Sequence, residues 1–213
     1  MNVQEATTRR LPDLKERHLP ENCRETINTI LKETYGYEQF RNLEIYDDLS
    51  KGKEKLCISQ GQLIENVILE AEKAWKSETQ VDNILLTAPT GSGKSLLFQL
   101  PAIYLGKEYN LLTIVVSPLK ALIVDQVESL QELGYARVAY ASSDLSPEQK
   151  MEVYRQVREG EIDLFYLSPE LLLSYDIKHF VGERRIGLVV VDEAHTVTTW
   201  GKEFRVDYWF CLL

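Results

Sequence analysis

The stretch Ala88-Pro89-Thr90-Gly91-Ser92-Gly93-Lys94-Ser95 follows a short apolar run and precedes a segment of helical length. A loop that wraps a chain of phosphates must turn tightly and point successive N–H groups inward, so glycines are needed at Gly91 and Gly93. A helix that begins directly after the loop adds further N–H donors and a favourable dipole. Lys94 is expected to place its charge at the outer phosphates, and Ser95 to offer its hydroxyl to Mg²⁺. The stretch therefore predicts a site for ATP and Mg²⁺; the alternative is a glycine-rich turn that binds nothing. The residues expected around the phosphates are Thr90, Gly91, Ser92, Gly93, Lys94 and Ser95.

Around this loop, short apolar runs rich in β-branched residues alternate with segments of helical length. The predicted strands are 84–88, 111–117, 137–141, 163–167 and 187–191. The predicted helices between them are 94–105, 119–133, 146–159 and 169–181. Strands that are apolar throughout and alternate with helices indicate an α/β fold with a parallel sheet covered on both faces. Ligands of such sheets bind beyond the carboxyl ends of the strands, where the phosphate loop lies.

A second chemical signal follows the last predicted strand, where the chain reads Val189-Val190-Val191-Asp192-Glu193-Ala194-His195. Asp192 is expected to hold the Mg²⁺ ion at the strand end. Glu193 is expected to orient and deprotonate the attacking water. Acids also follow buried strands as ordinary solvated residues, and the phosphate loop in the same chain argues against that alternative. His195 is expected either to couple the nucleotide state to neighbouring loops or to be an ordinary packed histidine.

Two helices are predicted before the phosphate loop. The first covers 22–35, with Asn22 as its cap and Gly36 as its stop, and the second covers 61–76. Residues 1–21 are polar and are expected to form an irregular lead-in, while 42–58 mix charges without a sustained period and are expected to form a surface insertion. The predicted domains are 1–35, 36–82 with this insertion, and 83–213.

The bulk composition excludes several classes of protein. The formal net charge is −9, so contact with nucleic acid requires a local strip of positive charge rather than a broad basic face. The first 20 residues contain no apolar core of a signal peptide, and no apolar run is long enough to span a bilayer. The three cysteines have no paired spacing, which argues against a disulfide framework or zinc module and suits a reducing cytosol. The expected location is the cytoplasm, at the nucleoid in a bacterium, or the nucleus in a eukaryote.

With the phosphate loop, the Asp192-Glu193-Ala194-His195 box resembles superfamily 2 helicases of the DEAH type, and five further motifs are similar to those of RecQ-like DNA helicases. These motifs are Tyr35-Gly36-Tyr37-Glu38-Gln39-Phe40-Arg41, Ser59-Gln60-Gly61-Gln62, Val116-Ser117-Pro118-Leu119-Lys120, Tyr166-Leu167-Ser168-Pro169-Glu170 and the aromatic loop 199–208. The resemblance covers about residues 33–210 and implies the first of two RecA-like motor lobes.

The resemblance implies a role for each of these motifs. Arg41 and Gln62 are implied at the nucleotide, with Gln62 reading adenine. The residues implied at single-stranded or partly duplex DNA are Ser117, Pro118, Lys120, Ser168, Pro169, Trp200, Lys202, Phe204 and Arg205. This chain departs from the family where the insertion 42–58 separates Arg41 from Gln62, and where Thr199, Lys202 and Val206 replace the family's usual glutamine, histidine and proline.

Plainer interpretations of the same residues stay open. Ser59 and Gln62 have the spacing of a capping box, so Gln62 is also expected as a helix cap. The Ser-Pro pairs are also compatible with ordinary strand exits. The aromatic loop interleaves Trp200, Phe204 and Tyr208 with cations, which suits stacking on single-stranded bases or, alternatively, a helical core stripe.

The last residue, Leu213, comes shortly after the acidic box. The resemblance implies a second lobe with an arginine finger that this chain does not contain, so the chain alone is expected to bind Mg-ATP weakly and to hydrolyse it poorly. Two other hypotheses stay open: a non-catalytic ATP- or nucleic-acid-binding module, and an RNA helicase or DNA translocase.

Overall fold

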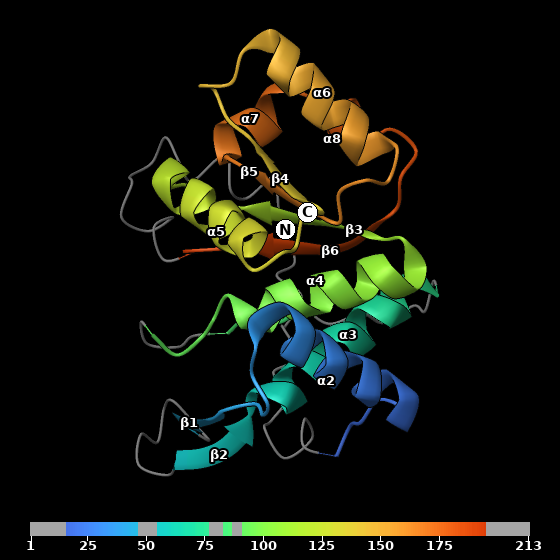
Figure 1. The fold of residues 1–213 in the computed structure, drawn as a ribbon, viewed down its shortest axis with the longest axis vertical. Coiled ribbons are helices and arrows are strands. Elements are labelled where there is room, and N and C mark those ends of the chain that lie inside the picture. The colour runs from blue at the N-terminus through green and yellow to red at the C-terminus, as the bar shows by residue number, and fades with distance from the viewer. Residues whose placement is uncertain (1–15, 47–54, 77–82, 87–90, 195–213) are drawn as a thin grey trace, which may run out of the picture. The chain divides into compact units, whose positions relative to one another are not determined.

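The computed structural model describes residues 16–46, 55–76, 83–86 and 91–194 (Figure 1). The chain divides into two compact units, Met1–Tyr104 and Leu105–Leu213, and each is described by itself. The domain boundaries expected from the sequence stay predictions.

The first helix described, α2 (Glu21–Tyr35), buries an apolar stripe and ends as expected at Gly36. Gly36 has φ 69°, and its N–H donates to the carbonyls of Leu31 and Lys32. The predicted cap at Asn22 is wrong, because the helix begins one residue earlier and its cap position is Pro20. The Pro20 carbonyl accepts from Cys23 N and Arg24 N at 3.1 Å each, so a backbone group starts the first turn.

The insertion expected at 42–58 forms an antiparallel pair of strands at its base, β1 (Asn42–Tyr46) and β2 (Lys55–Ser59). Asn42 pairs with Ser59 and Tyr46 with Lys55. Each strand has only 5 residues, so the alternation of apolar residues in NLEIY and KLCIS is too short to form a sustained period. The hairpin returns the chain to its starting point, so Arg41 and Gln60 become neighbours: Gln60 N–H donates to the Arg41 carbonyl at 2.9 Å.

The helix α3 (Gln60–Trp75) begins at a capping box on Ser59, one residue before its predicted start. Its inner surface carries acidic side chains as well as apolar ones, and these hold the segment that precedes α2. Leu19 N–H donates to Glu65 Oε2 at 3.0 Å, and Arg17 Nη2 lies 2.7 Å from Glu70 Oε1. The described part of the lead-in is therefore fastened to α3 by ionic and hydrogen-bonded contacts.

The strand predicted at 84–88 is not formed over the part that the structure describes. Residues 83–86 have no regular secondary structure, and Leu85 is 85% exposed. A strand requires a hydrogen-bonded neighbour, and within the described residues no other segment pairs with this one. The helix after the phosphate loop, α4 (Leu96–Tyr109), is formed as expected and runs four residues beyond the predicted end.

The second unit is built on a parallel sheet, as predicted from the alternating pattern, and its strand order is β4-β5-β3-β6. Its strands are β3 (Leu112–Val116), β4 (Val138–Ala141), β5 (Leu164–Leu167) and β6 (Ile186–Val191). The registers place Val116 and Ala141 opposite Leu167, so the carboxyl ends of β3, β5 and β4 lie level with one another.

Helices cover both faces of this sheet (Figure 1). Side chains of one parity, including Ile114, Phe165 and Ala139, form the core with α6 (Pro147–Arg158) and α8 (Ile177–Val181). Side chains of the other parity meet α5 (Lys120–Glu132), where Tyr166 Oη lies 3.4 Å from Gln126 Oε1. Burial on both faces explains why β3, β4 and β5 are apolar at nearly every position, whereas β6, at the edge of the sheet that the structure describes, is only partly buried.

The helix predicted over 169–181 is two helices, α7 (Pro169–Ser174) and α8. The break lies at Tyr175 and Asp176, because the Asp176 carboxylate accepts from Lys178 N–H at 2.8 Å and caps a new helix. Among the residues that the structure describes, no helix combines the length and the apolar character needed to cross a membrane.

Candidate nucleotide and nucleic-acid site

The described part of the phosphate loop has the backbone geometry that a phosphate cradle requires. Gly91 and Gly93 have φ of 80° and 78°, a region that side-chain-bearing residues rarely adopt. The first turn of the following helix starts at once, since Leu96 N–H donates to the Gly93 carbonyl at 3.2 Å and Leu97 N–H to the Lys94 carbonyl at 3.0 Å. Lys94 and Ser95 therefore stand at the positive end of the α4 dipole.

Ser92, between the two glycines, carries a buried hydroxyl oxygen with no hydrogen-bond partner. A buried polar atom without a partner is costly and is commonly satisfied by a ligand or by water. Glycine φ values, a helix N-terminus and this unpartnered hydroxyl together fit a bound triphosphate.

Gln60 joins the phosphate loop to the segment before the hairpin. Its side-chain oxygen accepts from Arg41 N–H at 3.1 Å, and its side-chain nitrogen donates to the Ser92 carbonyl at 3.1 Å. A Cβ atom at Gly93 would lie 2.6 Å from that nitrogen, so the glycine allows the close approach. Gln60 is 2% exposed, and both ends of its carboxamide are held.

Gln62 has the capping role that the sequence left open as an alternative. Its side-chain oxygen accepts from Ser59 N–H at 3.1 Å, and the Ser59 hydroxyl accepts from Gly61 N–H at 3.2 Å. The adenine-reading role of Gln62 stays a prediction. Gln60 was not predicted from the sequence as a contact of the phosphate loop. A signal was present, because a capping box uses the Gln62 carboxamide and leaves the Gln60 carboxamide of the same motif available for another partner.

The segment before the hairpin brings an aromatic ring and a cation together on the surface. The Arg41 guanidinium carbon lies 5.9 Å from the centre of the Tyr37 ring. Phe40 packs on the start of α3, where a Cβ atom at Gly61 would lie 2.7 Å from its ring. The hairpin register keeps Arg41 beside Gln60, so the insertion does not remove Arg41 from the region of the phosphate loop.

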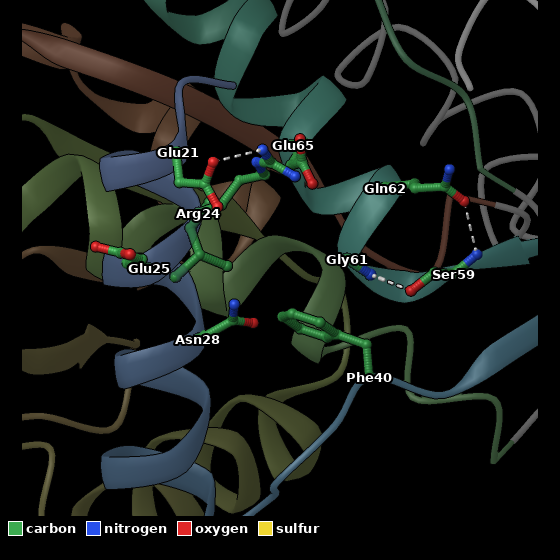
Figure 2. A pocket seen from close by; sticks show the side chains of 10 residues that line it. Glu21, Arg24, Glu25, Asn28, Phe40, Ser59, Gly61, Gln62 and Glu65 are labelled. Carbon is green, nitrogen blue, oxygen red and sulfur yellow. Dashed lines mark hydrogen bonds and ion pairs between the residues drawn. The ribbon is translucent and has the colours of Figure 1, made fainter. Parts of the chain in front are cut away.

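A cavity of about 240 Å³ lies between α2 and the start of α3 (Figure 2). Its ionisable lining consists of Glu21, Glu25 and Glu65 with Arg24, which is 3.8 Å from Glu21. Three carboxylates against one guanidinium disfavour a triphosphate. The cavity is therefore not the phosphate site, and Gln62 lines it beside its own cap partner Ser59 (Figure 2).

The acidic pair stands directly beyond β6. Asp192 N–H donates to the Val116 carbonyl at 2.9 Å, which extends the pairing with β3 by one residue. Glu193 then turns with φ 50°, and its N–H donates to Asp192 Oδ1 at 2.9 Å. A glutamate in the left-handed region is strained, and such strain is concentrated at functional sites.

The Ser-Pro pairs predicted at nucleic acid lie at the carboxyl ends of the neighbouring strands β3 and β5. Ser168 caps α7, since its hydroxyl accepts from Leu171 N–H at 3.4 Å, as expected for the alternative of an ordinary strand exit. Ser117 does not cap α5, whose cap position is Leu119, and its buried hydroxyl oxygen has no partner. All four residues of the two pairs are buried, while Lys120 is exposed at the start of α5.

Several predicted residues lie outside the described part of the chain. They are Thr90, His195, Trp200, Lys202, Phe204 and Arg205. The phosphate loop belongs to the first unit, whereas Asp192, Glu193 and the Ser-Pro pairs belong to the second. Their assigned roles at ATP, Mg²⁺ and nucleic acid stay predictions.

The family model and the curated relatives both point to helicases. Residues 69–212 match the family described as DEAD/DEAH box helicase. The protein named ATP-dependent DNA helicase RecQ from Synechocystis is 33% identical over 187 residues, which cover 87% of this chain and 32% of that protein. The protein of the same name from Bacillus subtilis is 32% identical over 180 residues, which cover 84% of this chain and 25% of that protein.

The chain thus spans a third or less of the length of these relatives. Among solved structures, the DUF1998 helicase MrfA bound to DNA and AMPPNP is similar with a TM-score of 0.50 and 22% identity, over 84% of this chain and 22% of that one. This similarity concerns the fold alone.

Proposed function

Because the chain belongs to the DEAD/DEAH box helicase family, we propose that it is the ATP-binding first motor lobe of a RecQ-like DNA helicase, which couples ATP hydrolysis to movement along single-stranded DNA and to duplex unwinding. The observation that carries the proposal is the hydrogen bond from Gln60 to the Ser92 carbonyl. It connects the motif resembling the family's nucleotide-sensing segment directly to the phosphate loop.

ATP binding is assigned to the loop and the helix that follows it. N–H groups of Gly91, Ser92 and Gly93 surround the phosphates, and Lys94 supplies a positive charge. Ser95 and Asp192 are the residues proposed to hold Mg²⁺, which when bound neutralises charge on the phosphates.

Hydrolysis is assigned to Glu193 as the base that orients and deprotonates water. Its left-handed backbone supports this assignment, because strain of this kind is tolerated where a side chain must be aimed. Since the relatives are at least three times longer than the match, we propose that a second RecA-like lobe completes the ATP cleft. An arginine finger from that lobe is worth about 10³–10⁵ in rate where one is used.

Recognition of the base is assigned to the neighbourhood of Tyr37, Arg41 and Gln60. The Gln60 carboxamide connects the Arg41 backbone to the loop, so loss of that carboxamide disturbs both. We expect Gln60→Ala to weaken ATP binding and Gln62→Ala to lower helix stability with a smaller change in ATP affinity. The reverse order would return the base-reading role to Gln62.

The nucleic-acid surface is assigned to the carboxyl ends of β3 and β5. Ser117 and Ser168 stand level with each other there, and Lys120 contributes an exposed cation beside them. Contacts of this kind hold the phosphate backbone and carry no base specificity.

The deciding experiment measures ATP hydrolysis with and without single-stranded DNA, in the protein that carries this chain. Stimulation by DNA is expected, and Lys94→Ala or Glu193→Gln should abolish it. Stimulation that survives either change would refute the assignment. Matched DNA and RNA oligonucleotides in competition then identify the substrate, because a preference for RNA would replace the DNA helicase by an RNA helicase.

A further inference from the structure

The carboxyl end of a third strand, β4, lies level with those of β3 and β5. The registers align Ala141 and Val116 with Leu167, so the residues that follow these strands, Ser142, Ser117 and Ser168, form a row. All three serines are buried. The loop after β4, residues 142–146, therefore continues the edge on which the nucleic-acid contacts are proposed.

Two lysines from different helices converge on this loop. Lys120, the first residue of α5, donates through Nζ to the Ser143 hydroxyl and lies 3.0 Å from Asp144 Oδ1. Lys150, in α6, donates through Nζ to the Ser143 carbonyl at 3.5 Å. One carboxylate, Asp144, thus shares the loop with two ammonium groups.

The loop holds this carboxylate in a defined position. Asp144 N–H donates to the buried Ser142 hydroxyl at 3.3 Å, and the Ser143 hydroxyl donates to Asp144 Oδ1 at 3.2 Å. The bond from Lys120 and the bond from Ser143 lower the pKa of Asp144, so the group is charged at neutral pH. Glu148, a second acid close by in the sequence, accepts a hydrogen bond from the Ser146 hydroxyl at 2.8 Å.

A carboxylate between a lysine ammonium and a serine hydroxyl has the same kind of partners as a phosphate of a nucleic-acid backbone. We propose that Asp144 is an internal anion that occupies Lys120 when nucleic acid is absent, and that a backbone phosphate displaces it, gaining Lys120, Ser143 and Lys150 as partners. The inference rests on the proposed function, since it requires nucleic acid at the edge of the sheet.

The exposure of the pair makes such an exchange feasible. The Lys120 and Asp144 side chains are 46% and 72% exposed, and ion pairs at such sites contribute little net stability. Displacement therefore costs little, and the internal carboxylate lowers nucleic-acid affinity only modestly. Release of Lys120 by removal of the Asp144 charge should raise the affinity for single-stranded DNA by about two- to fivefold.

The experiment measures binding of a fluorescent oligothymidylate to the protein that carries this chain, over a series of salt concentrations. The variants are Asp144→Asn, Lys120→Ala and their combination, with Glu148→Gln as the matched control for loss of a nearby negative charge. Asp144→Asn should bind more tightly than Glu148→Gln, and the gain should disappear when Lys120 is alanine. Lys120→Ala should weaken binding and reduce the logarithmic salt dependence by about 0.7, the value for one phosphate contact on a single strand.

The outcomes distinguish a failure of the proposed nucleic-acid surface from a failure of the proposed exchange of anions. If Lys120→Ala binds like the unchanged protein, the nucleic-acid surface under the proposed function is wrong. If Lys120→Ala weakens binding but Asp144→Asn gains no more than Glu148→Gln, only the exchange of anions is refuted. A gain from Asp144→Asn that persists in full without Lys120 also refutes it, because the carboxylate then acts through general repulsion.

Discussion

Replacement of Asp163 by asparagine tests how the amino edge of the sheet is held together. Asp163 precedes β5, and its side chain is fully buried. It accepts from Arg137 Nε at 2.6 Å, from Arg184 Nη2 at 3.1 Å and from Tyr135 Oη at 2.7 Å. These partners come from the segments that lead into β4 and β6, so one carboxylate joins three strands.

The expected loss in the free energy of unfolding depends on how well each arginine tolerates the loss of the Asp163 carboxylate. Arg184 has a side chain only 5% exposed, and burial lowers its pKa, whereas the Arg137 side chain is 45% exposed and can be hydrated. Removing one partner of a buried pair costs about 3–5 kcal/mol. Because Arg137 can turn to water and asparagine keeps one acceptor oxygen, we expect the lower end, about 3 kcal/mol.

Thermal unfolding followed by circular dichroism measures this change. About 3 kcal/mol corresponds to a fall of about 6–12 °C in Tm for a chain of this size. Asp144→Asn is the control, since it removes a carboxylate from an exposed ion pair and should leave Tm unchanged. If Asp163→Asn shifts Tm no more than this control, the argument that the buried network holds the sheet edge is refuted.

Three further predictions concern the candidate site. Glu193→Gly should raise the free energy of unfolding by about 1 kcal/mol, because glycine adopts the left-handed backbone without strain, and should abolish ATP hydrolysis. Glu193→Gln should abolish hydrolysis without a change in stability. Equal unfolding midpoints for the two variants would contradict the claim that the Glu193 backbone is strained. Gly93→Ala should weaken ATP binding by about tenfold or more, measured by titration calorimetry. The new Cβ atom would clash with the Gln60 side chain, and alanine would also be strained at the positive φ of this position. Gly91→Ala has open space around its Cβ and should cost less, so an equal loss would contradict the role of that contact. Replacing residues 44–57 by an Asn-Gly turn should leave ATP affinity unchanged, because the bonds between Arg41 and Gln60 lie beyond the hairpin; a large loss would show that the hairpin supports the nucleotide site.

The local pattern of the sequence was sufficient for the elements that local interactions determine. The central strands of the parallel sheet are recognisable because burial on both faces makes nearly every position apolar, as in β3 and β5. The end of α2 at Gly36 was predictable because it depends on the backbone geometry of one turn, which glycine favours. The tight turn predicted at Gly91 and Gly93 is formed, because both residues adopt a positive φ that glycine allows without a steric penalty.

Tertiary structure decided what depends on distant partners. The insertion became a hairpin because Asn42 meets Ser59 across it, and residues 84–86 lack a strand because no described neighbour pairs with them. Gln60 rather than Gln62 reaches the phosphate loop, since Ser59 engages Gln62 and the hairpin closes beside Gln60. The pairing of Lys120 with Asp144 could not be predicted from the sequence either, because Lys120 begins α5 and Asp144 lies in the loop after β4, and the two meet only when β3, β5 and β4 align. Residue type and period thus determined the fold class and predicted the candidate motifs, while hydrogen bonds between segments far apart in the chain decided which side chains lie together.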